Sequence, residues 1–75
     1  DGLFNIYPIP ANDNIVVSSK LKDISLKIYD VSGKQIKSIN FDNTLELDLS
    51  NYKSGTYVLQ LQTREGFYCK NIILE

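Results

Sequence analysis

The chain has 75 residues, 43% of them apolar and 23% charged, so it is long enough for one globular domain and too apolar for a disordered segment. Its 8 lysine and arginine residues against 9 aspartate and glutamate residues give a formal charge of −1, which offers no basic surface to a phosphate backbone or an anionic membrane. Nucleic acid is therefore not an expected partner.

Seven short segments read as β-strands. Apolar residues occupy every second position in Ile24–Tyr29, at Leu45, Leu47 and Leu49, and at Tyr57, Leu59 and Leu61, as expected for strands with one buried face. Four further segments are less regular, namely Phe4–Tyr7, Asn14–Ser18, Lys34–Ile39 and Phe67–Leu74. No window of the chain sustains a helical period. The pattern predicts an all-β fold, an antiparallel β-sandwich of about seven strands, with residues 1–75 as a single domain.

Turn residues separate these strands. Asp30-Val31-Ser32-Gly33, Asp42-Asn43 and Arg64-Glu65-Gly66 each have the length of a hairpin connection. Asp30 can bond the backbone two residues on, Gly33 can take a positive φ without a Cβ penalty, and Asp42-Asn43 tolerates the left-handed conformations of a tight two-residue turn.

Two prolines limit what the first segment can do. Pro8 and Pro10 lack a backbone donor, so Tyr7-Pro8-Ile9-Pro10 is predicted to be an extended edge or corner segment and not a central strand.

Several features bear on chemistry. The chain has no His, Trp or Met, and its one cysteine, Cys69, has no partner for an internal disulfide and no histidine to activate it as a nucleophile. We expect Cys69 to be a buried or half-buried strand residue. Gly33-Lys34 lacks the rest of a phosphate-binding loop, and the acid and amide clusters at residues 12–14 and 42–43 lack the ligand number of a calcium site. We predict no enzyme activity, no cofactor and no metal.

Tyrosines could form a sugar-binding platform, but only Tyr29, Tyr52 and Tyr68 are expected to be partly exposed. Glu46 and Asp48 alternate with leucines on one strand and are expected on its solvated face.

The chain begins at Asp1-Gly2 without a methionine, so we expect it to be part of a longer protein. No stretch of about 18 apolar residues occurs, so no membrane span is expected, and no amino-terminal segment reads as a signal peptide.

The order of the motifs resembles the type A carboxy-terminal sorting domains of proteins exported by the type IX secretion system of Bacteroidota. The resemblance is carried by Tyr7–Asn14, Ile28–Lys34, Leu47–Leu49, Gly55–Val58 and Gly66–Leu74. Ile9 departs from the family pattern, which usually has Asn at this position. The residues that match family motifs, and are candidates for recognition, are Tyr7, Pro8, Pro10, Asp30, Gly33, Lys34, Gly55, Tyr57, Gly66 and Lys70.

The resemblance implies an immunoglobulin-like sandwich that acts as a carboxy-terminal secretion signal. Its implied partners are a covalently attached amino-terminal passenger, the outer-membrane translocon, and a sortase-like peptidase that removes the domain. The implied route leads through the periplasm to the cell surface or the medium. An immunoglobulin-like spacer or adhesion module is the alternative that the strand pattern supports equally well.

Two of these residues have a structural and a functional interpretation. Tyr57 is expected to be an inward aromatic whose hydroxyl bonds the preceding loop, and the alternative is direct contact with the translocon. Lys70 either discourages edge-to-edge strand pairing or is read by the export machinery. Exposed strand edges would also permit a weak homodimer.

Overall fold

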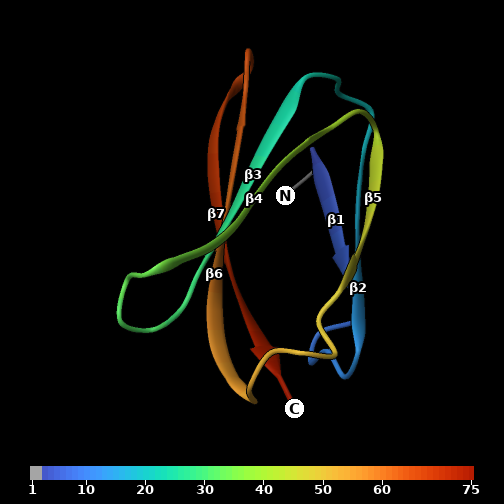
Figure 1. The fold of residues 1–75 in the computed structure, drawn as a ribbon. Coiled ribbons are helices and arrows are strands. Elements are labelled where there is room, and N and C mark those ends of the chain that lie inside the picture. The colour runs from blue at the N-terminus through green and yellow to red at the C-terminus, as the bar shows by residue number, and fades with distance from the viewer. Residues whose placement is uncertain (1–2) are drawn as a thin grey trace.

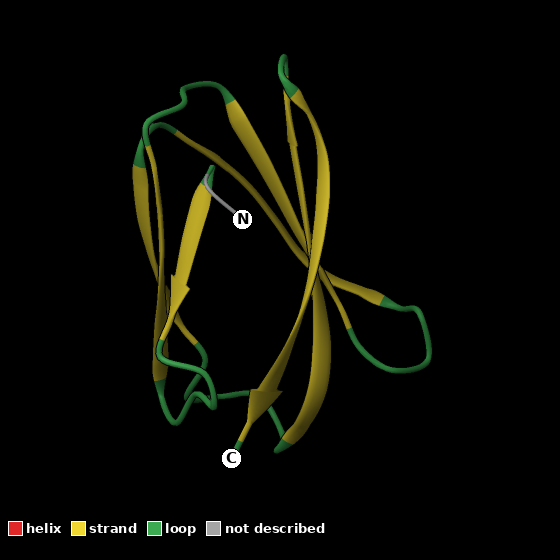
Figure 2. Cartoon of the chain, turned by 180° about the vertical axis from the view of Figure 1, so that it is seen from behind, coloured by secondary structure: helices red, strands yellow, loops and turns green. Residues whose placement is uncertain are grey.

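The computed structural model describes residues 3–75, and Asp1-Gly2, on which the expectation of a longer protein rests, lie outside this range. Seven strands form two antiparallel sheets that face each other as a sandwich (Figures 1 and 2). The strands are β1 Phe4–Tyr7, β2 Asn14–Ser19, β3 Ile24–Tyr29, β4 Gln35–Phe41, β5 Thr44–Asp48, β6 Gly55–Thr63 and β7 Gly66–Leu74. One sheet has the order β1-β2-β5 and the other β4-β3-β6-β7. The predicted all-β sandwich of seven strands is confirmed.

Residues 3–75 contain no helix with the length and apolar character needed to cross a membrane.

The core lies between the sheets and is built from the alternating residues of the inner strands. Leu26 and Ile28 of β3 lie beside Leu61 and Leu59 of β6 in the same sheet, and these four side chains and Ile24 are buried. The other buried apolar side chains are Phe4, Ala11, Ile15, Val17, Leu47, Leu49, Tyr57, Ile72 and Leu74. Burial of a side chain such as leucine stabilises the fold by about 1.5–3 kcal/mol, so this single core holds the two sheets together.

The strand ends differ slightly from the prediction, and local hydrogen bonds explain why. Lys34 precedes β4 because its N–H bonds Asp30 Oδ1 and its C=O accepts from the Asp30 N–H. Leu49 follows β5: its N–H bonds the carbonyl of Asp13, the next residue in the β2–β5 register, at 2.6 Å, and its own carbonyl accepts from the Tyr52 N–H of the turn that follows.

The prolines stand where the sequence predicts them. β1 is the edge strand of its sheet and ends at Tyr7, and Pro8 to Pro10 form the corner that follows. Beyond the corner, Ala11 forms a single parallel bridge with Leu74 at the end of β7. The first and last segments of the chain therefore meet along one flank of the sandwich.

Candidate recognition surface

The turn between β3 and β4 is held by one carboxylate. Asp30 Oδ1 accepts hydrogen bonds from the Ser32 N–H at 2.9 Å, the Ser32 hydroxyl at 2.6 Å and the Lys34 N–H at 3.0 Å. Gly33 has φ +89°, a left-handed conformation that favours glycine. Both sequence predictions for this turn are confirmed. The hairpin projects from the body of the sandwich, and Val31 near its tip is 81% exposed (Figures 1 and 2).

These hydrogen bonds also change the ionisation of Asp30. The Ser32 hydroxyl, and after it the Lys34 N–H, lower the pKa of the Asp30 carboxyl below its ordinary value of 3.8. At neutral pH the Asp30 carboxyl is therefore ionised and accepts these hydrogen bonds, and the turn projects with the exposed Val31 near its tip.

A second fixed point lies where the chain enters β6. The Tyr57 hydroxyl donates a hydrogen bond of 2.6 Å to the Lys53 carbonyl, and the Tyr57 ring is buried against that of Tyr52, with centroids 5.9 Å apart. This is the predicted tyrosine at a sandwich corner, with its hydroxyl bonded to the preceding loop. Tyr57 is buried, so its position favours the structural interpretation over direct contact with a partner.

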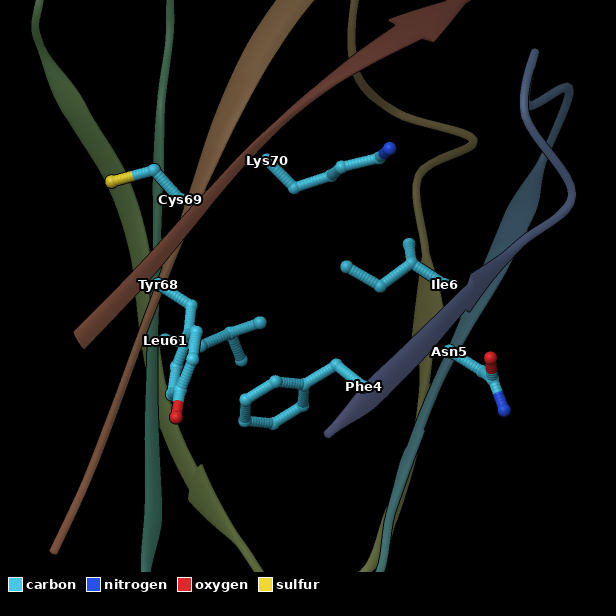
Figure 3. Close-up of a pocket in the computed structure, with 7 residues that line it drawn as sticks. All are labelled: Phe4, Asn5, Ile6, Leu61, Tyr68, Cys69 and Lys70. Carbon is cyan, nitrogen blue, oxygen red and sulfur yellow. The ribbon is translucent and has the colours of Figure 1, made fainter. Parts of the chain in front are cut away.

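A groove of about 260 Å³ lies on the flank between the edge strands β1 and β7. We call it the flank groove, and its lining consists of Phe4, Asn5, Ile6, Leu61, Tyr68, Cys69 and Lys70. In Figure 3, Phe4 and Ile6 point from β1 toward Leu61 and Tyr68, and the Lys70 side chain reaches from β7 toward β1. The rings of Phe4 and Tyr68 meet edge to face, with centroids 5.2 Å apart.

The motif residues do not gather in one site. Tyr7, Pro8 and Pro10 lie at and beyond the end of β1, and Gly55, which pairs with Leu74, opens β6. The other motif residues lie far apart. Asp30, Gly33 and Lys34 form the projecting hairpin, Gly66 opens β7 at the other end of the sheet, and Lys70 lies in the flank groove.

Two exposure predictions are wrong. Cys69 is exposed, because on β7 the inward positions are those of Tyr68, Ile72 and Leu74, and Cys69 falls on the opposite face. Figure 3 shows its thiol pointing away from the groove. Tyr7 is 51% exposed although it was not among the tyrosines expected at the surface, because it alternates with the inward Ile6 on an edge strand.

Sequence reasoning missed Phe4, Ile6 and Tyr68 as parts of a candidate site. They form it only because the first and last strands of the chain meet. The sequence contains one indication of the groove. Side chains alternate along a strand, so Lys70 lies on the same face of β7 as Tyr68, Ile72 and Leu74, which places a charged side chain at an inward position.

The chemistry of the flank groove suits binding. It combines apolar and aromatic side chains with one ammonium group, while the neighbouring thiol points to the other face of the sheet. Within residues 3–75, no three acidic or cysteine side chains come close enough together to hold a metal ion.

Comparison with known proteins bears on both the fold and the family. A family model described as a secretion system C-terminal sorting domain matches residues 5–75. A search of curated proteins finds no match. The chain is similar to a solved structure of PorZ, an essential surface component of the type IX secretion system of Porphyromonas gingivalis, with a TM-score of 0.82 and 14% identity. The match covers 96% of this chain but only 11% of the PorZ chain, and at this identity it shows a shared fold alone.

Proposed function

The chain belongs to the family of type IX secretion C-terminal sorting domains, and we propose that it is a non-catalytic address label for a passenger protein. The observation that carries this proposal is the family match over residues 5–75, which takes in all but the first residue of the seven-stranded fold. Membership of this family implies export to the cell surface or the extracellular space.

The proposed route has three steps. The passenger, attached to the amino-terminal side of residues 1–75, first reaches the periplasm. The outer-membrane translocon of the type IX system then recognises the sandwich and exports the passenger. A sortase-like peptidase finally removes the domain at the surface. The description of the family as C-terminal sorting domains supports the attachment of a passenger.

The features that support the proposal are two connections held by hydrogen bonds. The Asp30 turn is held by its own hydrogen bonds, and Tyr57 holds the β5–β6 connection at the same end of the sheet, so binding of a partner to these backbone shapes would need little reorganisation. A label read in this way needs a folded sandwich and no reactive side chain.

A localisation assay tests the proposal. Residues 1–75 are fused behind a signal peptide and a fluorescent reporter, in a bacterium with an active type IX system and in a translocon mutant. We expect reporter in the medium or on the surface of the first strain only. Periplasmic reporter in both strains, with the fusion shown to be folded, would contradict the proposal.

Removal of the domain is tested separately, by mass spectrometry of the exported reporter. A sorting label that is cut off should be absent from the mature product. Its persistence on an exported reporter would leave the address role intact and exclude the peptidase step. Persistence on a surface protein that does not need the translocon would instead favour the immunoglobulin-like spacer or adhesion module.

A further inference from the structure

Two contacts close the flank between β1 and β7. At one end the rings of Phe4 and Tyr68 are in contact, and at the other Ala11 bridges Leu74. Between these closures the two edge strands belong to different sheets and do not pair, and the flank groove occupies this interval.

The β7 edge that borders the groove carries unused backbone groups. Ala11 donates to the Ile73 carbonyl and accepts from the Glu75 N–H, so the odd-numbered residues of β7 direct their backbone groups away from β6. The β6–β7 ladder is regular from Gly55–Leu74 to Thr63–Gly66, so the alternation extends to Cys69 and Asn71. Among the described residues, nothing but Ala11 pairs with this edge. The N–H and C=O groups of Cys69 and Asn71 are therefore open to another strand.

The chain itself cannot fill this position. A parallel strand leading back from Ala11 would place residues 8 to 10 along the β7 edge, but Pro8 and Pro10 have no N–H to donate. The chain turns instead into the other sheet, where β1 pairs with β2.

Lys70 supplies the charge of the groove. Its side chain reaches toward β1 across the opening, between the backbone groups of its two neighbours (Figure 3). Within residues 3–75, no carboxylate forms an ion pair with it. A negatively charged group that enters here would gain a charge-assisted hydrogen bond beside an apolar surface formed by Ile6 and Leu61.

We propose that the flank groove binds an extended peptide segment of another protein, which adds to β7 as a strand and places an acidic side chain against Lys70. The backbone of the segment bonds Cys69 and Asn71, and its carboxylate accepts from the Lys70 ammonium. This proposal rests on the geometry of the sandwich and does not depend on the proposed function.

Peptide titrations followed by NMR test this proposal on the 75-residue chain. The probe is acetyl-Thr-Val-Glu-Val-Thr-amide, and the matched control has Gln in place of Glu. We expect saturable shifts of the Cys69 and Asn71 amides with the first peptide and binding about tenfold weaker with the second, because one charge-assisted bond is lost. A peptide N-methylated on its central backbone amides should not bind, since it cannot extend the sheet.

Charge reversal on the protein gives the complementary test. Lys70→Glu should lose binding of the Glu peptide and gain binding of a Lys-containing one, and its thermal unfolding should match that of the parent chain because Lys70 is exposed. Equal affinity for the Glu and Gln peptides, or shifts confined to other strands, would overturn the proposal. So would shifts at Cys69 and Asn71 that depend on protein concentration alone, because a second copy would then occupy the edge. Peptide binding together with failed export would refute only the secretion role.

Discussion

Single side chains hold the connections of this sandwich by bonding to nearby backbone groups. Asp30 does so between β3 and β4, Asp48 accepts from the Ser50 N–H after β5, and Thr63 accepts from the Glu65 N–H before β7. These interactions depend on neighbours in the sequence, so the Asp30 turn and the Tyr57 corner could be predicted from residue type and spacing. The orientation of Cys69 could not, because it depends on which face of β7 the rest of the fold covers.

The Tyr57 corner should contribute measurably to stability. Tyr57→Phe keeps the buried ring and removes the hydrogen bond to Lys53, so we expect the free energy of unfolding to fall by about 1 kcal/mol. Tyr52→Phe is the matched control, because its hydroxyl makes no hydrogen bond with residues 3–75, and its effect should stay within about 0.5 kcal/mol. Urea unfolding measures both. Equal effects of the two changes would show that the corner bond is not stabilising.

Asp30 should make the stability of the domain depend on pH. Its pKa is lower in the folded chain than the ordinary 3.8, so its ionised form stabilises the fold above that value. This contribution is lost as the pH falls through the folded-state pKa. We expect Ser32→Ala to raise the pKa of Asp30 toward 3.8, because the Ser32 hydroxyl is the largest cause of the shift.

An NMR titration of the Asp30 carboxyl in the parent chain and in Ser32→Ala measures this change directly. The difference in unfolding free energy between the parent chain and Asp30→Asn should also narrow on acidification. An unchanged pKa in Ser32→Ala would show that the backbone donors alone set the ionisation of the turn.

Strand periodicity identified the elements where one face is buried and the other solvated. β3, β5 and β6 follow this pattern, so the sequence predicts which of their side chains point into the core. β7 does not, because it carries Lys70 at an inward position and the exposed Phe67 and Ile73 on its outer face. Its existence could be predicted, but not the direction of its side chains.

β6 is a central strand of the four-stranded sheet. It pairs with both β3 and β7, and Leu59 at its centre is fully buried. Leu59→Ala should cost about 2–5 kcal/mol, a large part of the total of about 4–11 kcal/mol expected for a chain of this length. Val58→Ala, on the half-buried outer face of the same strand, should cost under about 1.5 kcal/mol. Urea unfolding measures both, and similar losses would mean that the outer face is also covered.

At the scale of the whole molecule, the candidate site depends on contacts between the two ends of the chain. The flank groove joins Phe4 and Ile6 to Tyr68 and Lys70, and the Ala11–Leu74 bridge closes one end of the flank. The order of motifs along the sequence indicated the family, because each motif is local. It could not indicate the groove, because no local pattern specifies which edge strands lie side by side.

This closure makes the last strand part of the fold as well as a candidate for recognition. Removing residues 66–75 takes Ile72 and Leu74 from the core and leaves β6 without one of its two neighbours. Two fully buried side chains contribute about 3–6 kcal/mol between them, against about 4–11 kcal/mol for the whole domain. We therefore expect the truncated chain to lose its cooperative urea transition, measured by circular dichroism, and a cooperative transition at the parent midpoint would contradict this. Failed export of that truncation would then report unfolding, whereas Lys70→Ala keeps every core residue and tests recognition in a folded domain.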